Sequence, residues 1–141
     1  MGTRSRIGRI KSDGSITSIY THWDGYPSHH LPILTQHYGS TVQIDALLAL
    51  GNLSMLAPQI GEQHDFESRE RTDWCTAYCR DRNEEDCSSI TSRNEVVFAA
   101  ACSDWDADYA YLWDGCQWMP SRVVDKPLPH IVPISPASAN A

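Results

Sequence analysis

The order of apolar and polar residues near the start of the chain predicts a β-hairpin. Residues 3–10 and 15–23 are both strand-like. The four residues between them, Lys11-Ser12-Asp13-Gly14, favour a turn because Gly14 can adopt a positive φ. We therefore expect an antiparallel pair of strands that ends at a second turn, over residues 24–27.

Apolar residues at helical spacing follow this hairpin and predict two helices. The first covers about residues 28–38 and the second residues 42–50, and a glycine stands just past each of them. Either Ser40 or Thr41 opens the second helix, since a hydroxyl side chain can cap a helix N-terminus. The residues expected to face the core are Leu31, Leu34, Tyr38, Ile44, Leu47 and Leu48.

The second half of the chain predicts three more strands and a third helix. Residues 74–80 are strand-like, and residues 109–113 and 116–119 form a hairpin about an Asp-Gly turn. Ser92 and Glu95 have the spacing of a capping box, so a helix is expected to start there.

Together these elements predict a small α+β domain. We expect an antiparallel sheet of four or five strands with two or three helices on one face. A chain of 141 residues and 15.8 kDa suits one domain, which we place at residues 1–122. Residues 123–141 contain four of the eight prolines and are interpreted as an extended or disordered tail.

Charge narrows the function classes. The formal net charge of −7 argues against general nucleic-acid binding through a wide basic surface. No apolar run reaches the roughly 18 residues needed for a membrane span. By position, residues 1–11 carry only positive charges and residues 12–68 contain no Lys or Arg, whereas acidic residues gather at 81–86 and 104–108.

The five cysteines are an odd number, and no apolar segment of a secretory signal follows the basic N-terminus. We therefore expect no disulfide scaffold and a cytoplasmic location. Cys75 and Cys79 would lie about 13 Å apart on a strand, too far to share a zinc ion. The cysteines are interpreted as small buried residues, and we expect neither a metal nor a cofactor.

Several short motifs together resemble a family of small uncharacterised proteins encoded by tailed bacteriophages and prophages. The resemblance covers about residues 3–119 and departs at Asn52 and Asn83, where the family has Asp and Gly, and in the Pro-rich tail. The family has no established activity, so the resemblance implies no catalytic role. It implies an accessory protein in the cytoplasm of a bacterial host that modulates the host or counters its defences. The motifs are TRSRI at 3–7, IYTHWDGYP at 19–27, HY at 37–38, LALGNLSML at 48–56 and YCRDR at 78–82.

Arginines provide one candidate site. Arg4 and Arg6 point to the same face of the first predicted strand. Arg80 and Arg82 are also two residues apart, so on a strand they too would share a face. Convergence of these strand ends would surround a phosphate-bearing nucleotide or an acidic loop with guanidinium groups and aromatic rings. Alternatively, Asp24, Asp73 and Asp81 neutralise the arginines within the protein. The candidate ligand-binding residues are Arg4, Arg6, Tyr20, His22, Tyr78, Arg80 and Arg82.

An acidic and aromatic patch after the third predicted helix provides the other candidate site. With the acidic residues of 81–86 it can imitate nucleic-acid phosphates and speed encounter with a basic enzyme, although such runs are often solvated loops. The candidate partner-binding residues are Asp104, Trp105, Asp106, Asp108 and Tyr109.

The leading hypothesis is a non-catalytic phage protein that inhibits a host protein in an anti-defence role. One alternative is a module that sequesters a nucleotide signal, and another is a hydrolase that uses His22 and Asp24. Homo-oligomerisation is left open.

Overall fold

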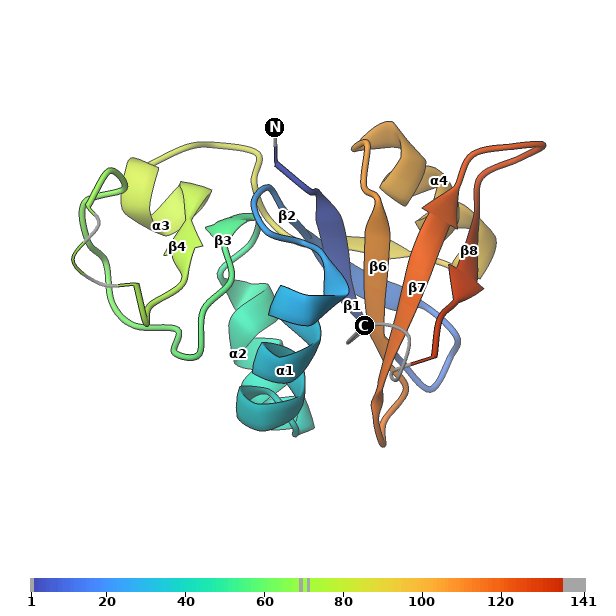
Figure 1. Ribbon diagram of the computed structural model, residues 1–141, viewed down its shortest axis with the longest axis horizontal. Coiled ribbons are helices and arrows are strands. Elements are labelled where there is room, and N and C mark those ends of the chain that lie inside the picture. Colours follow the sequence, from blue (N-terminus) through green and yellow to red (C-terminus); the bar gives the residue numbers. More distant parts are fainter. Residues whose placement is uncertain (1, 69, 71, 136–141) are drawn as a thin grey trace.

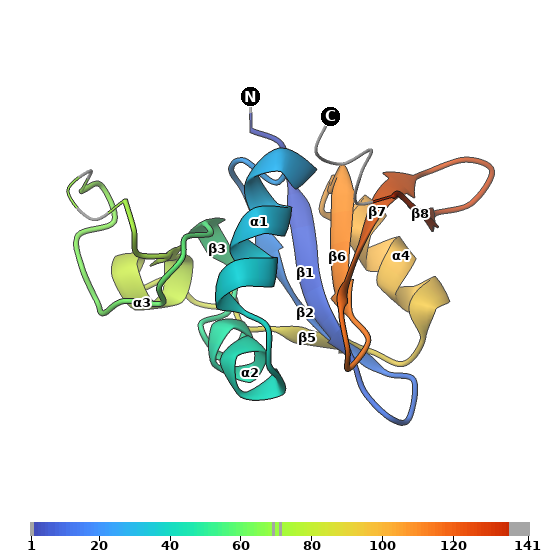
Figure 2. The same ribbon diagram turned by 60° about the horizontal axis from the view of Figure 1, so that its bottom comes forward.

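The computed structural model describes residues 2–68, 70 and 72–135. Within these residues the strands form one eight-stranded sheet, with helices on both of its faces (Figures 1 and 2). The strands are β1 (Ser5–Ile10), β2 (Ile16–Thr21), β3 (Leu53–Met55), β4 (Thr76–Ala77), β5 (Ile90–Ser92), β6 (Tyr109–Trp113), β7 (Trp118–Val124) and β8 (His130–Pro133). The helices are α1 (Pro27–His37), α2 (Thr41–Ala49), α3 (Tyr78–Arg82) and α4 (Glu95–Asp104).

Both predicted hairpins are present. β1 and β2 pair antiparallel from Ser5 opposite Thr21 to Ile10 opposite Ile16, and β6 and β7 pair antiparallel across the loop after Trp113. In the first turn, the Gly14 amide donates to the Lys11 carbonyl at 2.9 Å, with Gly14 at φ +87°. Local turn chemistry therefore determines these two pairings.

The sheet as a whole differs from the antiparallel sheet of four or five strands that the sequence predicts. Its order is β4-β3-β2-β1-β6-β7-β8, and β5 pairs with β2. The β1–β6 and β2–β3 pairs are parallel, so the sheet is mixed. No local turn can specify a parallel pair, because its two strands are joined through a long connection. The sequence pattern therefore misses both.

The expectation that the helices cover a single face of the sheet is also wrong. Leu34 of α1 and Leu47 of α2 pack in one core cluster, against strand residues such as Ile7. Phe98 of α4 packs in a second cluster, against strand residues such as Leu112. Successive strand residues point to opposite faces, so a sheet with apolar residues on both sides needs a helix on each (Figure 2).

Local sequence signals located α1, α2 and α4 well, but the first residues of these helices less well. Ser40 caps α2 by accepting a hydrogen bond from the Gln43 amide, as predicted. The predicted cap of the third helix is wrong, because Asn94 accepts from the Val97 amide and caps α4, while Ser92 ends β5.

The segment 74–80 is not one strand. Only Thr76–Ala77 pairs in the sheet, and α3 follows at once. The Asp81 carboxylate accepts from the Ala77 amide at 2.8 Å, which satisfies a backbone donor at the start of α3. The Asp81 side chain, four residues after Ala77, thus stabilises a helical turn where the sequence predicts a strand.

The sheet includes residues on both sides of the domain boundary predicted at residue 122. β7 continues to Val124, and β8 pairs antiparallel with it from Ser121 opposite Pro133 to Val124 opposite His130. Residues 136–141, the end of the predicted tail, lie outside the described residues.

Candidate functional site

Arg6 is a buried structural residue rather than a ligand-binding one. It lies on β1, is 1% exposed, and donates from Nε and Nη2 to the Ser18 hydroxyl and carbonyl at 3.0 and 3.1 Å. Its guanidinium lies 5.5 Å from the Trp105 ring centroid. Burial lowers the pKa of Arg6 to about 10, so it stays charged at neutral pH.

Arg80 is occupied by internal contacts. Its guanidinium donates to the Asp81 carboxylate at 3.0 Å and to the carbonyls of Ile60 and Cys75, both at 2.7 Å. Burial raises the pKa of Asp81, but hydrogen bonds from Arg80 and two backbone amides outweigh burial and lower it. Arg80 and Asp81 therefore form the internal neutralisation that the sequence offers as an alternative.

The remaining two arginines, Arg4 and Arg82, each have a carboxylate partner, and both lie near enough to Tyr78 for their charges to oppose the rise that burial causes in its pKa. Arg4 contacts Asp106 at 3.4 Å between Nη1 and Oδ2. Arg82 pairs with Glu84. The four guanidinium groups do not all converge on one site, because β1 directs Arg6 into the core and α3 turns Arg80 toward Asp81, whereas Arg4 and Arg82 both lie near Tyr78.

A small groove, which we call the acidic-aromatic groove, lies where the acidic loop after α3 meets Trp105 of the second predicted acidic segment. It has a volume of about 160 Å³. The loop after α3 contributes carboxylates on one side. Trp105, which follows the C-terminal end of α4, contributes an indole on the other. Its lining residues are Tyr20, Asn52, Tyr78, Glu84, Glu85, Asp86, Cys87 and Trp105.

Backbone contacts hold the loop of this groove against the sheet. The Asn52 amide donates to the Cys87 carbonyl at 2.7 Å, and the Asn52 side chain accepts from the Tyr20 amide at 2.9 Å. Gly51 precedes Asn52 at φ +77°, and a Cβ there would collide with the Cys87 carbonyl. This close approach needs glycine.

A disulfide between Cys79 and Cys87 also holds this loop, contrary to the prediction that the cysteines are all thiols. The two Cα atoms are 6.0 Å apart. This closeness arises because Cys79 lies on the short helix α3, after which the chain turns back, and not on an extended strand. Cys75 and Cys102 are buried thiols, as the sequence suggests.

Trp105 is the aromatic centre of the groove. It is 39% exposed, and its ring lies 5.0 Å from that of Tyr20. Asp104, Asp106 and Asp108 flank it with exposed side chains. Tyr109 does not join them, because it is half-buried and packs against the core cluster of α1 and α2.

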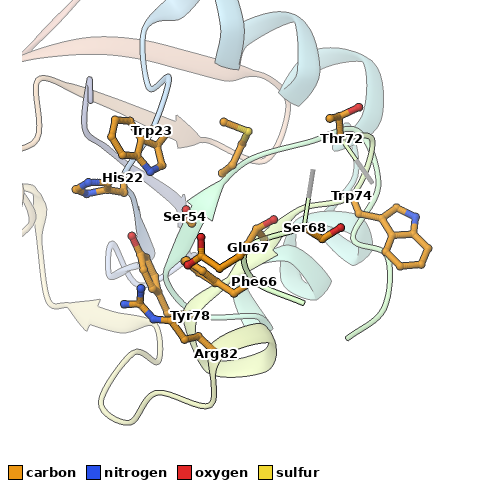
Figure 3. A pocket seen from close by; sticks show the side chains of 12 residues that line it. His22, Trp23, Ser54, Phe66, Glu67, Ser68, Thr72, Trp74, Tyr78 and Arg82 are labelled. Atoms are coloured by element: carbon orange, nitrogen blue, oxygen red, sulfur yellow. The ribbon is translucent and has the colours of Figure 1, made fainter. Parts of the chain in front are cut away.

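A larger cavity, which we call the aromatic pocket, adjoins the groove and shares Tyr78 with it (Figure 3). Its volume is about 860 Å³. Three predicted ligand-binding residues line it, namely His22, Tyr78 and Arg82. The sequence does not predict the other walls of this pocket. Four of the residues that form them lie in the segment 61–72, which is polar and loop-like. Those walls are formed by Trp23, Ser54, Met55, Phe66, Glu67, Ser68, Thr72, Trp74 and Thr76.

His22 is tied to a tyrosine and not to an aspartate. Its Nδ1 lies 2.7 Å from the Tyr20 hydroxyl. Burial and, secondarily, the charge of Arg4 lower the pKa of His22. In the part of the chain that the structure describes, no hydrogen bond or ion pair joins His22 to Asp24, which sits in a turn at φ +56°. The predicted hydrolytic His-Asp pair is therefore not formed.

Comparison with protein-family models, curated proteins and solved structures finds no match to this chain. Among the described residues, no three His, Cys, Asp or Glu side chains are grouped so that they could hold a metal ion. Over the same residues, no helix has the length and apolar character needed to cross a membrane.

Proposed function

We propose that the protein binds and inhibits a basic host protein through the acidic-aromatic groove, without catalysis. The observation that carries this proposal is the meeting of the acidic loop 84–86 with the exposed indole of Trp105, which itself stands within the acidic segment 104–108. The segments are separated in sequence, and the fold brings them to one surface.

The charges of this surface are only partly neutralised. Asp106 pairs with Arg4 and Glu84 with Arg82. Within the described residues, Glu85, Asp86 and Asp104 form no salt bridge and their side chains are exposed. An unneutralised acidic surface attracts a basic partner and raises the rate of encounter.

Trp105 suits the role of a binding anchor. Contacts with Tyr20 and Arg6 fix one side of the indole, while more than a third of the residue is exposed to solvent. A ring held in place loses little conformational entropy on binding, and exposed Trp residues often dominate the energy of an interface. A Lys or Arg side chain of the partner would be attracted by both the ring face and the carboxylates.

The sequence resemblance supports a host protein as the partner. The motifs at residues 19–27 and 78–82 that carry the resemblance include Tyr20 and Tyr78, two walls of the groove. A phage accessory protein with an acidic binding surface is consistent with interference in a host process.

The test uses a bacterial host lysate and then a purified partner. A Glu85→Gln/Asp86→Asn/Asp104→Asn variant should bind the captured protein at least about tenfold more weakly, and Trp105→Ala should weaken it similarly. Glu62→Gln/Glu95→Gln is the control, since it removes two exposed carboxylates away from the groove. Equal affinity of the triple variant and the wild type, or inhibition that survives it, would contradict the proposal.

A further inference from the structure

The aromatic pocket has the size of a small-molecule site. Its volume of about 860 Å³ falls within the range of known ligand pockets. Its walls come from separate parts of the chain, namely the end of β2, strand β3, residues 66–68, 72, 74 and 76, and α3 (Figure 3). The proposed partner binding makes no use of this cavity.

Aromatic rings supply its apolar walls. Trp23 is 41% exposed although a Cβ on Gly2 would lie only 2.7 Å from its ring, so the N-terminus backs one side of the indole. The rings of Phe66 and Tyr78 lie 5.4 Å apart. Figure 3 shows Trp23, Phe66 and Tyr78 around the same space, whereas the indole of Trp74 points away from it. Rings in fixed positions favour a planar ligand that can stack on them.

A cation marks one side of these rings. The Arg82 guanidinium lies 4.5 Å from the Phe66 ring centroid and 4.9 Å from that of Tyr78. Its carboxylate partner Glu84 is 40% exposed, and such solvated pairs are worth little energy. An incoming phosphate can therefore compete for the guanidinium, which forms two parallel hydrogen bonds with phosphate oxygens.

Polar groups of the pocket match the rest of a nucleotide. Because His22 contacts Tyr20 through Nδ1, its Nε2 remains for a ligand. The hydroxyls of Ser54 and Thr76 line the same cavity, and the Glu67 carboxylate adds a hydrogen-bond acceptor for a base amino group or a ribose hydroxyl.

We propose that the aromatic pocket binds a nucleotide, with its base among Trp23, Phe66 and Tyr78 and its phosphate at Arg82. The site is separate in charge and position from the acidic-aromatic groove, although Tyr78 borders both. The chain would then hold two kinds of partner, a basic protein and a small anion.

The test is calorimetric titration of the full chain with AMP, GMP, CMP and UMP, together with adenosine and inorganic phosphate. At least one nucleotide should bind and raise the melting temperature, and the matching nucleoside should bind about tenfold or more weakly. Arg82→Gln and Phe66→Ala should each weaken nucleotide binding by about tenfold. Arg122→Gln, which removes an exposed cation outside the pocket, should leave nucleotide affinity unchanged.

Three results would overturn the proposal. The first is failure of every nucleotide to bind. The second is equal binding of nucleoside and nucleotide, which would remove the phosphate from Arg82. The third is binding that survives both Arg82→Gln and Phe66→Ala. Melting curves of the free variants show whether each is folded, and the Glu85→Gln/Asp86→Asn/Asp104→Asn variant, whose residues do not line the pocket, separates this test from that of the groove.

Discussion

The aromatic pocket and the acidic-aromatic groove lie on either side of Tyr78 and have opposite chemistry. The pocket is large, has several aromatic walls and receives the guanidinium of Arg82. The groove is small and is edged by Glu84, Glu85 and Asp86. Two surfaces of different charge are thus built around one shared ring.

The end of α3 explains how neighbouring residues serve different surfaces. Asn83 ends the helix in the left-handed conformation at φ +55°, and its amide donates to the Tyr78 carbonyl. Arg82, before this reversal, lines the pocket, whereas Glu84, after it, lines the groove. The sign of each surface therefore depends on a single backbone turn, which Asn adopts more readily than most residues.

The largest expected effect is a difference in the free energy of unfolding between a variant of the buried Arg6 and a variant of the exposed Arg82. Arg6→Ala should lower the free energy of unfolding by about 3 kcal/mol, because it opens a cavity below Trp105 and leaves the Ser18 carbonyl without its donor. Arg82→Ala should cost less than about 1 kcal/mol, since its ion pair is solvated. Urea unfolding of both variants measures the difference.

Arg6→Lys is the control for charge. It keeps the positive charge but loses the planar guanidinium that contacts Ser18. Its free energy of unfolding should therefore lie between that of the wild type and that of Arg6→Ala. Equal stability of Arg6→Ala and Arg82→Ala would show that the groove does not rest on Arg6.

The next effect concerns the disulfide that connects the two regions. A Cys79→Ser/Cys87→Ser variant should lose about 2 kcal/mol of unfolding free energy, because the bond closes a loop with a sequence separation of 8. It should also weaken binding at both sites, since the loop carries Arg82 on one side and Glu84–Asp86 on the other.

Cys116→Ser, which removes an exposed thiol, should change neither stability nor binding. If the double variant weakens the groove alone, the contacts of Arg80 and Asp81 suffice to hold the pocket wall, and the two surfaces are less dependent on each other than the shared loop suggests.

The parts of the fold that the sequence predicts correctly are those set by neighbouring residues. Gly14 determines the first hairpin and Ser40 the start of α2. The parallel pairing of β1 with β6 depends on packing between distant segments, so no local pattern reveals it. The strands β3, β4 and β5 have only 3, 2 and 3 residues, too few for a period to be recognised.

The candidate site divides in the same way. The acidic loop 84–86 and Trp105 are visible as composition, and the structure brings them together. The four arginines do not all meet because a sequence pattern gives side-chain parity but not partners: Arg6 is buried and Asp81 pairs with Arg80. Phe66 was missed because it is a single ring in a polar loop, and only its tertiary contacts with Arg82 and Tyr78 reveal a pocket wall.

The smallest expected effect tests whether Tyr78 serves the two regions through different atoms. Burial raises the pKa of Tyr78, so its hydroxyl stays protonated at neutral pH, and Ser54 of the pocket hydrogen-bonds to it. Tyr78→Phe removes only this hydroxyl, so Ser54 in the pocket wall loses a hydrogen-bond partner, and nucleotide binding should weaken by about threefold. Groove affinity should not change, because the ring remains. Tyr78→Ala, which removes the ring, should weaken both.

Titration of the Tyr78→Phe variant with a nucleotide and with the basic partner measures these changes side by side. Loss at the groove as large as that at the pocket would mean that the hydroxyl orders the whole loop after α3, and not only the pocket wall that contains Ser54. Two surfaces that share a ring but differ in the atoms they use can be changed separately by mutation. The small, one-sided effect of this variant is therefore the most direct measure of their independence.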